Sequence, residues 1–172
     1  AVAALALTGC TKEDAPVDNG TDESVAETSF PEKDIRLIIQ ANPGGGSDLS
    51  SRALAAELED ILGVNVIAEN KPGAAGAIAM EYVGDQPADG YTIGFGPVEI
   101  AMLNTTQNAN VLPENYTFLG QIMDAPGVIS VGANSPYETL EDLVEAAQSG
   151  EITVSNSGVG SIWEAAGIGL GA

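Results

Sequence analysis

Short apolar runs alternate with glycine-bearing loops along the chain from Phe30 onward. Residues 35–39 are apolar and rich in β-branched side chains, which predicts a buried parallel strand. Residues 64–68 and 91–95 have the same character. Each run leads into small residues and then into a helical pattern. Three strand–loop–helix units in succession predict an α/β fold with a parallel sheet and helices on both faces.

The spacing of apolar residues predicts two helices in this first half. Residues 49–62 place Leu54, Leu58 and Ile61 on one helical face, together with Leu62, and Gly63 ends the helix. We expect Asp48 to act as its N-cap. After a loop at residues 69–76, a second helix is expected to present Ala75, Ile78, Ala79, Tyr82 and Val83 to the core.

The pattern changes after Asn115. Residues 118–122, 127–132 and 152–154 are apolar and could form strands of a second lobe. Between them, Thr139 and Asp142 have the spacing of a capping box, which predicts a helix. Its buried stripe is expected to contain Leu140, Leu143, Val144 and Ala147. A further helix is expected from Trp163.

Two loops of small residues are the candidate binding elements. In the first, at residues 43–48, three glycines leave backbone N–H groups open next to a helix N-terminus, where a small anion could bind. Asp48 there could pair with Arg52 or contact a ligand amine or water. The second loop, at residues 157–161, offers serine hydroxyls and bare N–H groups that suit a carboxylate.

Composition restricts the function. The net charge of −20 argues against nucleic acid as a partner. Histidine is absent, and no phosphate-loop, nucleophile-elbow or dinucleotide-binding motif occurs. We therefore expect no enzyme, no catalytic residue, no metal site and no cofactor. A nucleotide-binding α/β domain, with phosphate at the first glycine loop, is the alternative.

The first ten residues resemble the end of a bacterial lipoprotein signal peptide. Leu7-Thr8-Gly9-Cys10 matches a lipobox, so residues 1–9 are interpreted as part of a signal peptide and Cys10 as the lipidation site. Residues 10–29 are acidic and lack periodicity, which is typical of a disordered tether. Ten apolar residues are too few to span a bilayer.

Five segments of the chain form a combination of motifs: Ile35-Arg36-Leu37-Ile38, Pro43-Gly44-Gly45-Gly46-Ser47-Asp48, Glu69-Asn70-Lys71-Pro72-Gly73-Ala74-Ala75-Gly76, Ala88-Asp89-Gly90-Tyr91-Thr92 and Ser157-Gly158-Val159-Gly160-Ser161. Together they resemble the substrate-binding proteins of tripartite tricarboxylate transporters, also called Bug receptors, and the resemblance covers Phe30 to Ala172. It implies a two-lobed periplasmic binding protein of type II, with lobe 1 at residues 30–112 and lobe 2 at residues 113–172. Family members are longer, so the chain is expected to be the N-terminal part of one.

The resemblance also implies a function. Such a receptor captures a small carboxylate (a dicarboxylate or tricarboxylate, an acidic amino acid or an aromatic acid) and delivers it to membrane permease subunits. We expect a monomer in the periplasm or at the cell surface, held by lipidated Cys10. The ligand-binding residues implied are Pro43, Gly44, Gly45, Gly46, Ser47, Asp48, Asn70, Gly73, Ala74, Gly76, Gly96, Pro97, Ser157, Gly158, Gly160 and Ser161.

One position departs from the family pattern. Family members often carry a histidine shortly after the second loop, where this chain has Ile162-Trp163-Glu164. Glu164 is expected either to point away from a bound anion or to contact an amine. Trp163 could form a wall of the cleft or pack inside its lobe.

Overall fold

The computed structural model describes residues 29–150 and 152–170 of the 172-residue chain. Contacts divide the chain after Phe30, and residues from Pro31 onward form one unit that contains every described helix and strand. The expected signal peptide, the lipidation site at Cys10 and almost all of the tether lie outside the described residues.

A three-stranded parallel sheet forms the centre of the fold. Its strands are β1 (Ile35–Ile39), β2 (Val66–Asn70) and β3 (Thr92–Phe95), in the order β2-β1-β3. Ile35 pairs with Val66 and Ile39 with Asn70, so the whole of β1 is matched by β2. This arrangement confirms the expected α/β class with a parallel sheet.

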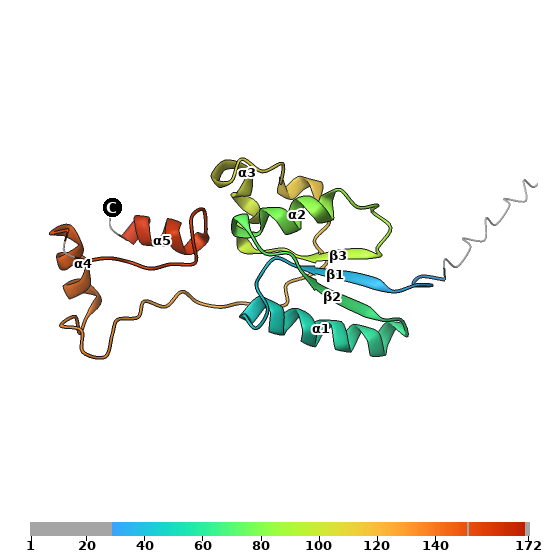
Figure 1. Ribbon diagram of the computed structural model, residues 1–172, viewed down its shortest axis with the longest axis horizontal. Helices are drawn as coiled ribbons and strands as arrows, with labels where there is room; N and C mark the ends of the chain where they lie inside the picture. Colours follow the sequence, from blue (N-terminus) through green and yellow to red (C-terminus); the bar gives the residue numbers. More distant parts are fainter. Residues whose placement is uncertain (1–28, 151, 171–172) are drawn as a thin grey trace, which may run out of the picture. The chain divides into compact units, whose positions relative to one another are not determined.

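Helices cover both faces of the sheet (Figure 1). On one face, α1 (Gly46–Leu62) packs Ala55 and Leu58 against Ile35 and Leu37. On the other face, α2 (Ala77–Gly84) packs Ala79 and Met80 in a cluster with Ile38. Because side chains alternate across a strand, Leu37 and Ile38 feed different cores, and β1 is buried on both faces.

Short helical segments close the core above α2. After β3 the chain forms η2 (Val98–Ala101), α3 (Leu103–Thr106) and η3 (Pro113–Asn115). Leu103 and Val111 are fully buried in the α2 cluster. These segments set the path of the chain from the sheet into its C-terminal part.

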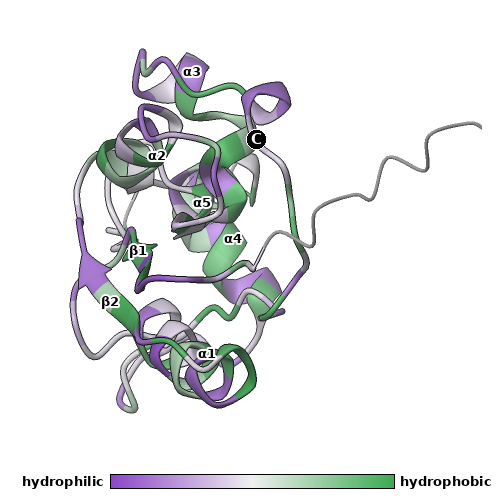
Figure 2. Ribbon diagram, turned by 90° about the vertical axis from the view of Figure 1, so that its right-hand side faces the viewer, coloured by the Kyte–Doolittle hydropathy of each residue, from purple (hydrophilic) through white to green (hydrophobic). Residues whose placement is uncertain are grey.

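Several local expectations were wrong in this half. The second strand is Val66–Asn70 rather than residues 64–68, because its pairing with β1 begins at Val66 and continues to Asn70. Asn65 lies just before the strand, and its carbonyl accepts the Ile35 N–H at 2.9 Å. The strand therefore ends in hydrophilic residues, which Figure 2 shows as a change of colour along β2. Ile61 and Ile78, expected in the core, are exposed.

The C-terminal part contains two helices, α4 (Leu140–Gln148) and α5 (Ile162–Leu170). Thr139 and Asp142 form the expected capping box at the start of α4. Leu140 is half exposed, however, so it was wrongly placed in a buried stripe. Trp163 and Ile168 on α5 are exposed.

The three strands expected after residue 117 do not form. Among residues 29–150 and 152–170, no strand follows β3. Val128 and Val154 are mostly exposed in extended chain. Apolar composition favours a strand, but a strand needs a neighbouring backbone to bond, and these segments have none among the described residues.

Candidate functional site

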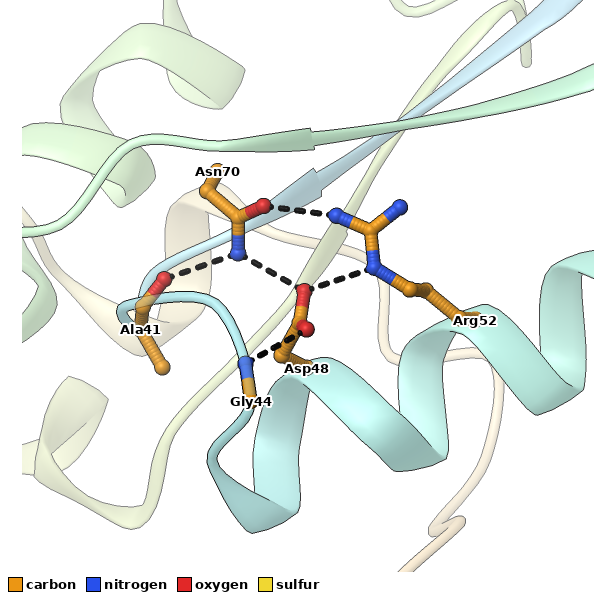
Figure 3. A network of polar contacts seen from close by, with 5 residues as sticks. All are labelled: Ala41, Gly44, Asp48, Arg52 and Asn70. Atoms are coloured by element: carbon orange, nitrogen blue, oxygen red, sulfur yellow. Dashed lines mark hydrogen bonds and ion pairs between the residues drawn. The ribbon is translucent and has the colours of Figure 1, made fainter.

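The first glycine loop is held by the protein's own carboxylate (Figure 3). The N-cap of α1 is Gly45, so the prediction that Asp48 is the N-cap was wrong. Asp48 instead lies in the first helical turn and accepts the N–H of Gly44 through Oδ2 at 2.8 Å. Gly44 has φ +87°, which a glycine adopts without steric cost.

Two further donors reach the other oxygen of Asp48. Arg52 Nε donates to Oδ1 at 3.0 Å, which confirms the pairing expected from the i, i+4 spacing. Asn70 Nδ2 donates to the same atom at 2.8 Å and also to the carbonyl of Ala41 at 2.9 Å. The hydrogen bond from Gly44, followed by those from Asn70 and Arg52, lowers the pKa of Asp48 to about 2. Asp48 therefore remains a buried anion that fixes the loop.

The second loop repeats this arrangement. Ser161 precedes α5, and its hydroxyl oxygen accepts the N–H of Glu164 at 3.2 Å. Glu164 Oε2 accepts the N–H of Gly160 at 2.7 Å, and Gly160 has φ +79°. Glu164 thus points back to its own loop, as the first of the two expectations for it proposed.

The third loop carries unusual backbone geometry. Gly73, Ala74, Ala75 and Gly76 have φ of +129°, +46°, +51° and +101°. Alanine in this left-handed region costs on the order of 1 kcal/mol, and such strain is often concentrated at binding sites. A tight left-handed turn at residues 73–76 therefore follows β2 and introduces α2.

The three loops meet at one cleft of about 870 Å³. Of the residues expected to bind ligand, nine line it: Ser47, Gly73, Ala74, Gly76, Gly96, Pro97, Ser157, Gly158 and Ser161. Pro43, Gly44, Gly45, Gly46, Asp48, Asn70 and Gly160 lie outside this lining. From the first glycine loop, then, only Ser47 reaches the cleft, while its neighbours and Asn70 hold the loop in place.

The cleft also has walls that sequence reasoning did not identify. Gln40, at the end of β1, lines it and donates weakly to Ser47 Oγ at 3.3 Å, while its own Oε1 is buried without a partner among the described residues. Glu99, Asp124 and Met123 line it as well. Glu99 follows β3 closely in the sequence. It could have been predicted as a cleft residue, because ligands of parallel α/β sheets bind beyond the carboxyl ends of the strands.

Polar contacts from two sides hold the second loop at the cleft. Glu99 Oε1, from η2, accepts the N–H of Ile162 at 3.1 Å, at the first residue of α5. Gln107 Nε2 donates to the carbonyl of Val159 at 3.0 Å. Trp163 lines the cleft and lies against Gly127, where an added Cβ would be 2.8 Å from the ring. Trp163 therefore combines both roles considered for it.

Arg36 and Lys71 are bound to partners that do not line the cleft. Arg36 pairs with Glu69 at 2.7 Å and also donates to the Tyr82 hydroxyl. The hydrogen bonds from Arg36 lower the pKa of Glu69, and those with Glu69 raise the pKa of Arg36. Lys71 lies over the Tyr82 ring at 4.2 Å. Within the described part of the chain, no lysine or arginine lines the cleft.

The described residues contain neither a metal-binding cluster nor a membrane span. In residues 29–150 and 152–170, no group of three or more Cys, Asp or Glu side chains is arranged to hold a metal ion. The helices of the same residues are all too short or too polar to cross a bilayer.

Curated relatives resemble the greater part of this chain. The "UPF0065 protein in gbd 5'region" of Cupriavidus necator is 31% identical over 132 residues, which cover 75% of this chain and 40% of that protein. Protein BugT of Bordetella pertussis is 26% identical over 148 residues, covering 83% and 45%. The chain thus spans less than half the length of these relatives.

Solved structures agree with the sequence matches. The periplasmic binding protein BugD is 25% identical with a TM-score of 0.61, and the match covers 83% of this chain and 50% of that one. Rpa4515 of R. palustris, solved with adipate, is 26% identical with a TM-score of 0.53, covering 70% and 41%. The fold is accordingly that of the periplasmic binding proteins of this type.

A family model matches residues 50–166, which is more than half of the chain. Its description, a receptor, agrees with the expectation that the protein is not an enzyme. The segment matched runs from α1 through the turn at residues 73–76 to α5, and so contains most of the cleft. The chain belongs to the tripartite tricarboxylate transporter receptor family.

Proposed function

We propose that the protein is an extracytoplasmic receptor that captures a small carboxylate in the cleft and delivers it to the permease of a tripartite tricarboxylate-type transporter. The two lobes are proposed to comprise residues 30–112 and 113–172. The receptor acts as a monomer in the periplasm or at the cell surface.

The convergence of the loops on one cleft carries this proposal. Ser47 comes from the start of α1, and Ser157 and Ser161 come from the loop before α5. Hydroxyl groups and the N–H groups of small residues can bind a carboxylate without a charged side chain. The adipate in the related Rpa4515 structure supports a carboxylate as ligand.

Calorimetry on the protein at its full natural length tests the proposal. Adipate, citrate, glutamate and benzoate form a suitable panel, and we expect one chemical class to bind with micromolar affinity or better and without turnover. Ser157→Ala should weaken that binding roughly tenfold, as expected for a hydrogen bond to a charged group. Ser149→Ala, at the end of α4 and outside the cleft, is the matched control.

Delivery and anchoring are tested separately. The receptor is expected to co-purify with permease subunits from membranes when the bound carboxylate is present. Cys10→Ser should abolish incorporation of labelled palmitate and release the receptor from the membrane, because one lipidated cysteine is the proposed anchor. Unchanged membrane association in that variant would contradict lipid anchoring.

A further inference from the structure

We propose that the sulfur of Met123 is a site of reversible oxidation by hydrogen peroxide, and that the sulfoxide formed there lowers the affinity of the cleft for its ligand. The effect on affinity rests on the proposed receptor function, whereas the oxidation itself does not. Met123 is thereby assigned as a modification site in the wall of the cleft.

Met123 is the most accessible of the three methionines in the chain. Met80 is 2% exposed in the core beneath α2, Met102 is half-buried, and Met123 is 39% exposed. Residues 117–132 around Met123 form neither helix nor strand. Because oxidation of a sulfur side chain follows its exposure to the oxidant, we expect peroxide to react with Met123 before the other two.

The sulfur of Met123 lies against the first turn of α1. Ser50 Oγ donates to Sδ at 3.5 Å, and a Cβ added to Gly46 would lie 3.9 Å from the same sulfur. Gly46 and Ser50 are four residues apart, so they share one face of the helix. Ser47, in the same turn, lines the cleft together with Met123. The sulfur is therefore placed beside one of the hydroxyl groups that the cleft offers to a ligand.

Oxidation turns this thioether into a strong hydrogen-bond acceptor. A lone pair of the sulfur attacks one oxygen of hydrogen peroxide, an S–O bond forms as the O–O bond breaks, and the proton of the transferred oxygen leaves with the hydroxide as water. The sulfur is oxidised by two electrons and the peroxide is reduced. A thioether is apolar and only a weak acceptor, whereas the sulfoxide is polar. A methionine sulfoxide reductase, supplied with a dithiol as reductant, reverses the step.

The added oxygen would meet the donors at the start of α1. Gly45 is the N-cap of this helix and has no side chain to bind the first N–H groups. The partial positive charge of a helix N-terminus attracts the negative end of the S–O dipole. The hydroxyl of Ser50, which donates to the sulfur, can also bond this oxygen. The sulfoxide therefore competes with a ligand carboxylate for Ser47 and the donors next to it, and the affinity decreases.

Peptide mapping by mass spectrometry tests the site of oxidation on the full-length receptor. During treatment with hydrogen peroxide, the peptide that contains Met123 should gain one oxygen roughly fivefold faster than those that contain Met80 or Met102. The same treatment in urea should oxidise all three at similar rates, because unfolding exposes them equally. Equal rates in the folded receptor would overturn the assignment of Met123.

Calorimetry with the panel of adipate, citrate, glutamate and benzoate tests the effect on binding. For the panel member that binds, peroxide treatment should weaken the affinity roughly tenfold, and treatment with the reductase should restore it. In Met123→Leu, the affinities before and after peroxide should agree within about twofold, since leucine has no sulfur to oxidise. This comparison is made within each protein, so an effect of leucine itself cancels.

Met102→Leu is the matched control, because Met102 does not line the cleft. This variant should lose affinity after peroxide as the unmodified receptor does. Recovery with the reductase is measured on the unmodified receptor and needs no variant.

The possible results separate this inference from the proposed function. If the oxidised receptor binds as tightly as the untreated one, or if Met123→Leu loses affinity to the same extent, the inference is overturned while the carboxylate receptor stands. If no carboxylate of the panel binds to the untreated receptor, the proposed function is overturned, and with it the effect on affinity. Peptide mapping decides the site of oxidation in either case.

Discussion

Asp48 shows how one side chain changes the role of a glycine loop. The sequence suggested an open cradle of N–H groups for an anion, yet the carboxylate four residues after Gly44 already binds the first of them. Glu164 does the same for Gly160. At the residue scale, these acids stabilise the loops, and ligand contact is left to their small neighbours in the cleft.

The lowered pKa of Asp48 predicts acid sensitivity. In the unfolded chain an aspartate titrates near pH 4, whereas the folded pKa is about 2. A depressed folded pKa stabilises the folded state above the unfolded pKa, and this contribution is lost as pH falls through about 4 toward 2. Urea unfolding at pH 6, 4 and 3 should show a decrease that is smaller in Asp48→Asn, while the part due to Glu69 and Asp142, whose pKa values are also lowered, remains.

Asp60→Asn is the control for this experiment, because Asp60 is exposed on the same helix. It should leave the pH dependence as it is in the unmodified protein. Equal pH dependence in the Asp48→Asn variant and the unmodified protein would contradict the structural role of the carboxylate.

Gly76 is the most restricted glycine of the left-handed turn at residues 73–76. It has φ +101°, and an added Cβ would lie 2.9 Å from Pro97 Cγ and 3.2 Å from Gln40 Cγ. Gly76→Ala should therefore lower the free energy of unfolding by roughly 1–3 kcal/mol, through strain and overpacking. Gly120→Ala, with open space around its Cβ and ordinary φ, should change the same quantity by less than about 0.5 kcal/mol.

At the element scale, local patterns were sufficient where one segment determines its own structure. The apolar run of β1, the end of α1 at Gly63 and the capping box of α4 were all predicted from neighbouring residues. The bounds of β2 were not, because its register follows from pairing with β1 and includes hydrophilic Asn70. Apolar segments after residue 117 could not be judged either, since propensity says nothing about whether a partner strand is present.

The same distinction applies to the candidate site. The loops that line the cleft could be predicted from small residues after strands and before helices. The N–H groups of Gly44 and Gly160 are each bound by a carboxylate four residues later, a local spacing that could have been read from the sequence. The hydrogen bond from the Ile162 N–H to Glu99 joins residues 63 positions apart, and sequence spacing does not reveal such a contact.

The capping box of α4 provides a test of helix stability. The Thr139 hydroxyl oxygen accepts the Asp142 N–H at 3.2 Å, and Asp142 Oδ2 accepts the Thr139 N–H at 3.0 Å. Thr139→Ala should destabilise α4 by about 1 kcal/mol, seen as faster amide hydrogen exchange in that helix. Thr139→Ser retains a hydroxyl and should exchange nearly as the unmodified protein does. Equal exchange in the alanine and serine variants would argue against the cap.

At the scale of the whole described unit, polar contacts join the sheet-bearing part to the second loop. Glu99 bonds the first N–H of α5, and Gln107 bonds the carbonyl of Val159. Ser50 on α1 also contacts Met123 Sδ at 3.5 Å. Because these contacts surround the cleft, they link the position of the second loop to the walls that would hold a ligand.

Loss of both hydrogen bonds should loosen the second loop without unfolding the sheet. Each bond is worth about 0.5–1.5 kcal/mol, so Glu99→Ala and Gln107→Ala should each speed amide exchange in residues 157–162 by roughly two- to tenfold. The double variant should show the largest effect, while β1 amides remain protected because their bonds lie in the buried sheet. Glu99→Gln, which keeps an acceptor for Ile162, should behave like the unmodified protein. If the double variant left exchange in residues 157–162 unchanged, these contacts would not hold the loop, and the cleft would depend on packing such as that of Trp163 against Gly127.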